Sequence, residues 1–330
     1  MNMLPRLDGK TVLILGGLGF IGTALTHRSI ALGATTIVVD NLLQDHGGNP
    51  YHFEQLKNQA EIYIKDIQSA DVLPSLISKA DFIFDLAAQT GHLRSMQNPC
   101  LDCDINVVAK LKILELCRQL NPSVKIIFTS TRQVYGKPQR LPVDETHPVH
   151  PVDFNGIHKL TAEWHLQMYH QIYGIPSVIL RLTNIYGRGM RIKDATQNFM
   201  GFWIRQILEE KPIPIYGDGK QIRDPLHVDD LVQALLLAAS SEHSTGQIFN
   251  LSGSEPVTLD TLAQKMIQAY GSGSCQYIDF PEGKKSIDIG SYFGDSQKIK
   301  INLGWEPLVS LEDGLRDTLE YYQKHQSFYL

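Results

Sequence analysis

Short apolar runs alternate with longer segments of helical spacing over the first 184 residues. Runs that are apolar at successive positions are typical of parallel strands covered by helices on both faces of a sheet. The pattern predicts strands at 11–15, 35–40, 61–64, 81–87, 124–130 and 177–182. Residues 105–120 and 159–174 space apolar side chains by three and four, which predicts helices with one polar face. The expected fold class is α/β with a doubly wound parallel sheet.

The alternation ends after Asn184, where the chain becomes richer in Gly, Pro, Lys and Asp. This change predicts a smaller, interleaved C-terminal α/β lobe. The run at 246–251, GQIFNL, is short and apolar enough to return one more strand to the main sheet.

Composition narrows the class of partner. The chain has 330 residues, 43% hydrophobic and 20% charged, with a formal net charge of -5. Without an excess of Lys and Arg we expect no nucleic acid partner. No run approaches the roughly 18 apolar residues of a membrane span, so we expect no membrane partner and a cytoplasmic location. Four cysteines form no disulfide framework, and the single pair Cys100 and Cys103 predicts no metal site.

A glycine-rich segment between the first predicted strand and a helix indicates a cofactor. Its sequence is Gly16-Gly17-Leu18-Gly19-Phe20-Ile21-Gly22. Glycines permit a tight turn, and the free N–H groups at the start of the helix can bind a pyrophosphate. The next strand ends in Asp40, whose carboxylate can accept both ribose hydroxyls of NAD and would repel the 2′-phosphate of NADP. The predicted cofactor is therefore NAD.

Further motifs in order along the chain resemble the extended short-chain dehydrogenase/reductase family, in particular its NAD-dependent nucleotide-sugar epimerases and dehydratases. They are Asp40-Asn41, Leu86-Ala87-Ala88, Thr129-Ser130-Thr131, Val134-Tyr135-Gly136, 181–187, Gly217-Asp218-Gly219, Arg223-Asp224 and Leu303-Gly304-Trp305. The resemblance covers nearly the whole chain. It implies an NAD-binding Rossmann domain at 1–184, to which 226–252 return, and a nucleotide-sugar-binding lobe at 185–225 and 253–330. It also implies a homodimer formed through the helices at 105–120 and 155–173.

The resemblance assigns roles position by position. Beyond the glycine loop and Asp40, the implied cofactor residues are Asn41, Asp66, Ile67, Leu86, Ala87, Ala88, Gln89, Asn106, Thr129 and Lys159. Thr131 matches the Ser or Thr that bonds the reacting sugar hydroxyl, and Lys159 matches the lysine that holds the nicotinamide ribose. The implied substrate residues are Arg132, Asn184, Arg191 and Arg223, with Lys284 and Lys285 where a second phosphate-binding cation is expected.

The chain departs from the family at its proton acceptor. The family base is a tyrosine four residues before the lysine, where this chain has Asn155, which cannot be deprotonated near neutral pH. His92 is the first candidate for a substitute base, because it follows the fourth predicted strand and histidine titrates in the working range. Tyr135 and His158 are alternatives. Asn155 could also orient the substrate through its amide.

A second departure concerns the reaction. Dehydratases of the family follow the Thr with Asp-Glu, where this chain has Arg132 and Gln133, and neither accepts a proton at neutral pH. Arg132 could bind a carboxylate or phosphate of the substrate. The preferred hypothesis is an NAD-dependent nucleotide-sugar 4-epimerase acting through a transient keto-sugar. The alternatives are another NAD-dependent enzyme of nucleotide sugars, namely a dehydratase, decarboxylase or dehydrogenase, or a catalytically silent NAD- and nucleotide-sugar-binding protein.

Overall fold

A parallel sheet of seven strands organises the part of the chain that the computed structural model describes, which is residues 5–43, 46–280, 283 and 285–330. In spatial order the strands are β11 (Ile248–Leu251), β6 (Ser177–Leu182), β5 (Lys125–Thr131), β4 (Phe82–Asp85), β1 (Thr11–Leu15), β2 (Thr35–Asp40) and β3 (Glu61–Ile64). Every neighbouring pair is parallel. The prediction of a doubly wound parallel sheet is confirmed.

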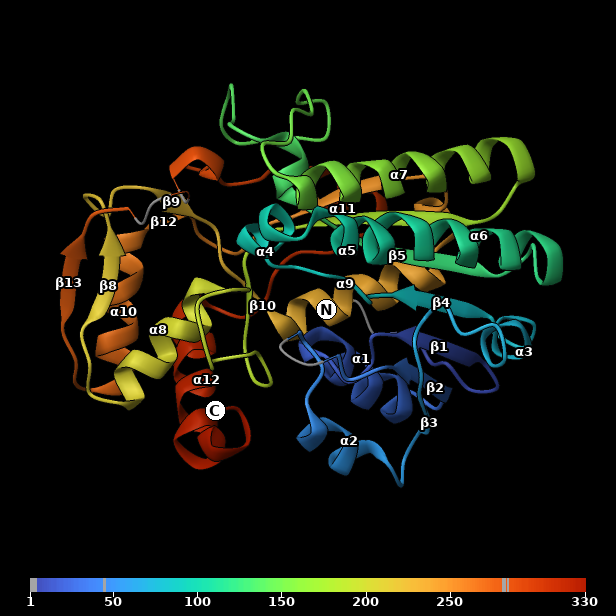
Figure 1. Cartoon of the computed structure of the whole chain (residues 1–330), viewed down its shortest axis with the longest axis horizontal. Helices are drawn as coiled ribbons and strands as arrows, with labels where there is room; N and C mark the ends of the chain where they lie inside the picture. Colours follow the sequence, from blue (N-terminus) through green and yellow to red (C-terminus); the bar gives the residue numbers. More distant parts are fainter. Residues whose placement is uncertain (1–4, 44–45, 281–282, 284) are drawn as a thin grey trace.

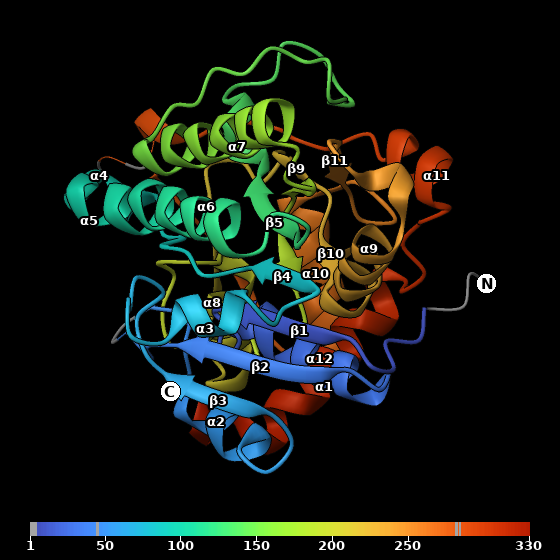
Figure 2. The ribbon, with the colours of Figure 1, turned by 90° about the vertical axis from the view of Figure 1, so that its right-hand side faces the viewer.

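Helices cover both faces of this sheet, as Figures 1 and 2 show. One face carries α1 (Phe20–Ala31) and α9 (Val228–Ser240), and the other carries α3 (Leu73–Ile77), α6 (Ala109–Leu120) and α7 (Phe154–Tyr173). Successive side chains of a strand point to opposite faces. In β1, Val12 and Ile14 therefore belong to the core under α1 and α9, whereas Leu13 and Leu15 belong to the core under α6 and α7.

The second lobe lies beside the carboxyl edge of the sheet (Figure 1) and has a core of its own. It is built from α8 (Phe199–Leu208), β8 (Ile213–Tyr216), α10 (Leu259–Tyr270), β13 (Cys275–Ile278) and α12 (Leu311–His325). The amphipathic α8 buries Met200 and Ile204 against Ile213, Leu262 and Leu315. Strand β13 pairs parallel with β8.

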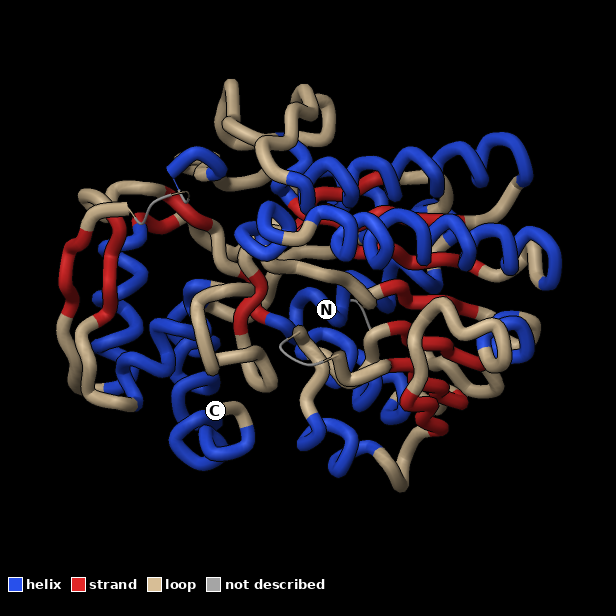
Figure 3. Tube along the Cα trace, in the orientation of Figure 1, coloured by secondary structure: helices blue, strands red, loops and turns tan. Residues whose placement is uncertain are grey.

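Shorter elements connect these layers. They are α2 (Pro50–Leu56), α4 (His92–Gln97), α5 (Pro99–Cys103), the π-helix η1 (Asp104–Val108), η2 (Arg132–Tyr135), β7 (Ile185–Tyr186), β9 (Ile222–Arg223), β10 (Leu226–His227), η3 (Glu242–Ser244), β12 (Val257–Thr258), η4 (Lys285–Ile287), α11 (Gln297–Leu303) and η5 (Gln326–Phe328). The long segment between η2 and α7 is loop (Figure 3). Among the helices that the structure describes, none combines the length and apolar character needed to cross a membrane.

The two predicted helices differ from the structure at their first residues. The segment predicted at 105–120 is continuous with η1, and its α-helical part begins at Ala109. Helix α7 begins before the predicted 159, because the Asp153 carboxylate caps it by accepting a hydrogen bond from the Gly156 N–H at 2.7 Å. It ends at Gly174, whose φ of 72° is a left-handed helix end. The cap brings Asn155 and Lys159 into α7 together.

Candidate active site

The turn between β1 and α1 is shaped for close approach of a ligand to the backbone. A Cβ on Gly16, which has a φ of 83°, would lie 2.7 Å from Ala87 N, and one on Gly22 would lie 2.2 Å from Gly16 O. Both positions therefore require glycine. Gly19 is the N-cap of α1 and offers no side-chain cap, so the N–H groups of Phe20 and Ile21 in the first turn can serve an anion. This cradle fits a pyrophosphate.

A cavity of about 100 Å³ opens at this turn. The predicted cofactor residues that line it are Gly16, Gly19, Asp40, Asn41, Asp66, Ile67, Leu86, Ala87 and Ala88. Sequence reasoning missed further lining residues, namely Leu43, His46, Gly47, Gly48, Gln68 and Ile105. No motif marks these positions, because they reach the cavity from a loop and from the side of η1.

Asp40 stands at the end of β2 in this cavity and is only 8% exposed. Its carboxylate accepts hydrogen bonds from Leu18 N–H at 3.0 Å and Leu42 N–H at 2.9 Å. Burial raises the pKa of Asp40, and these two N–H groups oppose the rise. Nearby, Asn41 donates to the Asp66 carboxylate at 2.9 Å. The fixed carboxylate at the strand end suits the hydroxyls of a ribose.

Gln89, Asn106 and Thr129, three further predicted cofactor residues, have hydrogen-bond partners within the protein. The Gln89 side chain folds back onto Gly91, and the Gln89 backbone carbonyl accepts a hydrogen bond from Asn106 Nδ2 at 2.9 Å. Asn106 is fully buried. Thr129 Oγ1 donates to Asp85 O at 3.3 Å. These side chains support the segment at the end of β4, and their contact with the cofactor stays a prediction.

Lys159 lies on α7 at the carboxyl end of β5, with a residue exposure of 5%. Its ammonium donates to Thr129 O at 2.9 Å and lies 4.7 Å from the centre of the Phe128 ring. Burial, together with the nearby positive charge of Lys110, lowers the pKa of Lys159 to about 7. The group is therefore poised to exchange a proton near neutrality.

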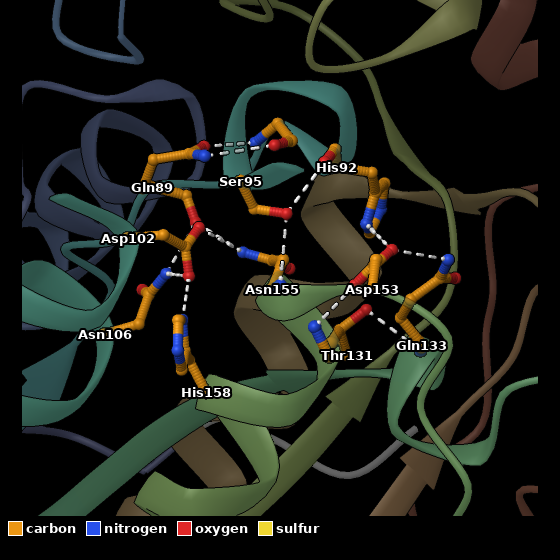
Figure 4. Close-up of polar contacts among 12 residues, drawn as sticks. Gln89, His92, Ser95, Asp102, Asn106, Thr131, Gln133, Asp153, Asn155 and His158 are labelled. Atoms are coloured by element: carbon orange, nitrogen blue, oxygen red, sulfur yellow. Dashed lines mark hydrogen bonds and ion pairs between the residues drawn. The ribbon is translucent and has the colours of Figure 1, made fainter. Parts of the chain in front are cut away.

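Asn155 stands four residues before Lys159 on α7 and is 2% exposed. Its amide Nδ2 donates to Gln89 O at 2.7 Å and to Asp102 Oδ2 at 3.3 Å (Figure 4). Asp102 also accepts from Asn106 and lies with Oδ1 2.6 Å from His158 Nδ1. The Asn155 amide thus ties α7 to the loop after β4 and to α5, and its role in orienting the substrate stays a prediction.

His92 begins α4 and faces a different buried carboxylate. Its Nδ1 lies 2.9 Å from Asp153 Oδ2, and the same oxygen accepts a hydrogen bond from Gln133 Nε2 at 3.0 Å (Figure 4). The Asp153 side chain is fully buried. Its burial would raise the pKa of Asp153, but His92, Gly156 and Gln133 together hold that pKa below its ordinary value. The carboxylate orients the imidazole, whose side chain is 33% exposed.

A second cavity, of about 220 Å³, lies between the sheet edge and the second lobe. Its lining on the sheet side consists of His92, Leu93, Arg132, Gln133 and Asn184. From the lobe and its connections come Ala195, Thr196, Gln197, Asn198, Phe199, Trp203, Pro214, Tyr216, Gln221, Arg223, Leu259, Phe280, Ile287, Asp288 and Ile289. The structure therefore brings together three of the four predicted substrate residues and the first candidate base.

Polar groups in this cavity are held in different ways. Arg223 donates to the carbonyls of Ile222 at 2.8 Å and Gly290 at 2.6 Å. Burial, together with the charge of Arg132, lowers the pKa of Arg223 to about 10. The Asn184 Oδ1 atom is buried and has no hydrogen-bond partner among the described residues. An incoming donor would satisfy it.

Two further predicted site residues point elsewhere. The Tyr135 hydroxyl is fully buried, where it donates to Asn250 Oδ1 at 2.7 Å and accepts from Arg181 Nη1 at 2.9 Å. Burial raises the pKa of Tyr135, so it is unsuited to accept a proton from a sugar. The Arg191 guanidinium lies 2.5 Å from Asp194 and reaches toward His46 of the cofactor cavity.

Neither Tyr135 nor Arg191 lines the second cavity, so the structure does not bring them together with the predicted substrate residues there. Lys284 lies outside the described residues, and Lys285 is exposed on η4. Within the described ranges, no group of three or more His, Cys, Asp or Glu side chains is arranged to hold a metal ion.

Thr131 ends β5 directly before Arg132, and its Oγ1 accepts a hydrogen bond from Gln133 N at 3.2 Å.

The chain matches the model of the NAD dependent epimerase/dehydratase family over residues 12–252. It belongs to that family. NAD is accordingly its cofactor, in agreement with the glycine cradle and the carboxylate of Asp40.

Relatives of known activity extend this assignment over nearly the whole chain. The CDP-paratose 2-epimerase of Salmonella typhi is 29% identical, with 94% of this chain and 98% of the relative covered. The UDP-glucose 4-epimerase of Thermotoga maritima, solved with UDP-glucose, has a TM-score of 0.88 and 30% identity over 96% of this chain and 99% of its own. The UDP-glucuronic acid 4-epimerase of Bacillus cereus has a TM-score of 0.85 and 27% identity, over 96% of this chain and 99% of its own. It was solved as a tyrosine-to-phenylalanine variant with a fluorinated UDP-glucuronic acid and NAD.

Replacing Gly19 with alanine should separate folding from cofactor binding. Gly19 has an ordinary extended backbone, and its added Cβ would lie 3.3 Å from Gly16 O, so a shift of a few tenths of an ångström would make room for it. The methyl group would however stand where the pyrophosphate approaches. We expect Gly19→Ala to keep its thermal unfolding midpoint and to lose at least about tenfold in NAD affinity measured by calorimetry. Gly22→Ala should instead destabilise the folded protein, because its Cβ would lie 2.2 Å from Gly16 O. Unchanged NAD affinity in Gly19→Ala would contradict the prediction that the glycine turn binds the pyrophosphate.

Lys159 should make stability depend on pH. Its pKa is about 7 in the folded protein against 10.5 in the unfolded chain, so the unfolded state binds more protons between these values. The free energy of unfolding of the NAD-free protein should therefore rise with pH above 7, relative to Lys159→Met, by up to about 1.4 kcal/mol per pH unit. Urea unfolding of both proteins at pH 7, 8 and 9 measures this difference. If the free energies of unfolding of the two proteins change with pH in parallel, the Lys159 ammonium stays protonated over this pH range and the prediction is wrong.

Proposed function

We propose that the protein is an NAD-dependent nucleotide-sugar epimerase that acts at C4 through a transient keto-sugar. The observation that carries the proposal is the His92–Asp153 pair, which stands in the wall of a 220 Å³ cavity that Arg132, Asn184 and Arg223 also line. A proton acceptor and anion-binding groups thus share one cavity. The three relatives described above act on nucleotide sugars, which supports the same substrate class.

The residues around the first cavity would hold the cofactor. The cradle of Gly16, Gly19 and Gly22 would take the pyrophosphate, and Asp40 would accept the ribose hydroxyls of the adenosine half. Bound NAD supplies the hydride acceptor of the reaction and later returns the hydride. Because the pocket rim carries a buried carboxylate at Asp40, it would disfavour an additional phosphate there.

His92 would hold the proton of the reacting hydroxyl. Asp153 lies on Nδ1, so it favours the tautomer with a proton on Nδ1 and a free lone pair on Nε2. Nε2 would take the sugar O–H proton when the C4 oxygen becomes a carbonyl oxygen, and it would return that proton to the same oxygen when the carbonyl is reduced. The nearby carboxylate stabilises the imidazolium that forms between the two steps.

Thr131 and Lys159 would position the reacting part of the sugar and the cofactor. Thr131 stands at the carboxyl end of β5, directly before Arg132, which lines the cavity. Lys159 is fixed by Thr129 O at the same strand end, where its charge would lower the energy of negative charge on a nearby oxygen. The Arg223 guanidinium, from the lobe side, and the Asn184 amide N–H groups, from the sheet side, would bind the diphosphate.

His92→Ala is the decisive variant for this function. With the base removed, we expect kcat to fall by about 10²–10⁴ while NAD affinity stays unchanged, because general base catalysis contributes in this range. The assay is proton NMR of the anomeric region with UDP-, dTDP-, GDP- and CDP-hexoses and hexuronic acids. His158→Ala is the matched control, since His158 also faces a buried carboxylate but does not line the cavity.

The outcomes separate the candidate functions. Interconversion of C4 epimers without added NAD by the wild-type protein would support the proposal. Dehydrated, decarboxylated or oxidised products would move the protein to another reaction of its family, and an inert panel with firmly bound NAD would favour a binding protein. A large loss in His158→Ala with full activity in His92→Ala would contradict the assignment of the base.

We also propose that a second copy of the chain packs against α6 and α7. Large apolar side chains recur along the outer face of α7 at Ile157, Trp164, Met168 and Ile172, with exposures of 44%, 57%, 50% and 62%. Their spacing of seven, four and four residues forms one stripe. A stripe of this size is typical of a helix that meets a partner helix. A two-fold arrangement would pair α6 and α7 with their own copies.

Trp164→Glu tests this dimer. A charge in the middle of the stripe should dissociate the dimer to a monomer of 37.1 kDa in light scattering coupled to size exclusion, because burial of an unpaired carboxylate is costly. Ile301→Glu, at a 73% exposed position on α11, is the control and should leave the mass unchanged. A wild-type monomer at micromolar concentration would contradict the proposed interface.

A further inference from the structure

No ion pair among the described residues links Arg132 to an acidic side chain, although the negative charge of the buried Asp224 acts on its guanidinium. Arg181 pairs with Glu163 at 2.6 Å, and Arg223 is held by two backbone carbonyls. For Arg132 the described residues provide no hydrogen bond or ion pair, and its buried Nε has no partner. The guanidinium carbon lies 5.5 Å from the centre of the Tyr292 ring, which packs against it without neutralising it. A buried guanidinium in this state is a ready anion receptor.

The surroundings of Arg132 strengthen the need for an anion. Arg223 lines the same cavity, and the positive charges of the two arginines oppose one another. Asp288, an acidic residue of the lining, lies 3.7 Å from Arg223 and accepts a hydrogen bond from Gln221 Nε2 at 2.7 Å, so its carboxylate already has partners on the lobe side. Burial lowers the pKa of Arg132, although the guanidinium remains charged at neutral pH. A carboxylate or phosphate oxygen of a ligand would accept hydrogen bonds from Arg132 and would offset the repulsion between Arg132 and Arg223.

The position of Arg132 indicates which part of a ligand it meets. It directly follows Thr131 at the end of β5 and lines the cavity with His92, on the side of the sheet and the cofactor. Arg223 and Phe280 come from the lobe side. With the reacting hydroxyl at His92, as in the proposed function, the sugar ring would lie on the sheet side and the diphosphate would extend toward the lobe. The substituent on the ring carbon next to the reacting carbon would then come within reach of Arg132.

We propose that Arg132 binds a carboxylate on the sugar ring, so that the substrate is a nucleotide hexuronate and not a neutral nucleotide hexose. A planar guanidinium can donate two parallel hydrogen bonds to one carboxylate. Such a pair would fix the orientation of the sugar ring and compensate the negative charge of its carboxylate. The inference rests on the proposed function for the orientation of the sugar. It adds to that function the chemical class of the sugar and a residue that determines specificity.

Calorimetry on the NAD-loaded protein tests the proposal with three matched ligands: UDP, UDP-glucose and UDP-glucuronate. We expect the wild type to bind UDP-glucuronate about ten- to a hundredfold more tightly than UDP-glucose, the range of a charge-assisted hydrogen-bonded pair. Arg132→Met should abolish this preference and leave the affinity for UDP unchanged. Arg132→Lys should retain part of it, because the charge remains but the fork is lost. Arg140→Met, at an exposed loop position, is the matched control.

Each result decides the question. Equal binding of hexose and hexuronate by the wild type overturns the proposal, as does a loss of UDP affinity in Arg132→Met, which would assign the arginine to the diphosphate. If UDP does not bind, the same series with GDP, GDP-mannose and GDP-mannuronate applies, and absence of binding in both series also overturns it. Because the measurement needs no turnover, selective hexuronate binding by an inert protein would refute the epimerase function alone.

Discussion

The buried carboxylate of Asp153 holds three separately built parts of the active site in one place. One oxygen caps α7 through Gly156, and the other meets Gln133 of η2 and His92 of α4. A buried carboxylate without partners is costly, so these contacts depend on one another. The start of α7 in turn sets the positions of Asn155 and Lys159. The base, the lysine and the wall of the substrate cavity therefore share a single anchor.

A second buried carboxylate, that of Asp102, connects the start of α7 to the loop after β4. It contacts Asn106, Asn155 and His158, and Asn155 also donates to the backbone carbonyl of Gln89. A hydrogen-bonded network of this kind rigidifies the loop after β4 against α7. That loop leads directly into α4, which begins with His92. Asn155 thus helps to fix the segment that carries His92.

The strands and the cofactor cavity were predictable from sequence because their signals are local. Apolar runs mark buried parallel strands, and the glycine loop followed by Asp40 marks the cradle and the end of β2. The direction of a side chain in a loop or at a helix start carries no such signal. Spacing could not show that Tyr135 turns into the core, that Arg191 pairs with Asp194, or that Asp153 reaches His92 across a long stretch of chain.

The order of the strands has a consequence for the growing chain. Strand β6 is complete at Leu182, but its outer neighbour β11 begins only at Ile248, after α8 and β8 of the second lobe have been made. Until then a central, apolar strand presents an open row of N–H and C=O groups, which invites pairing with other chains. A fragment that stops near Asn184 would keep this edge open, which favours aggregation. The sheet of the first lobe is therefore completed only after the chain has passed through part of the second lobe, although each lobe has its own core.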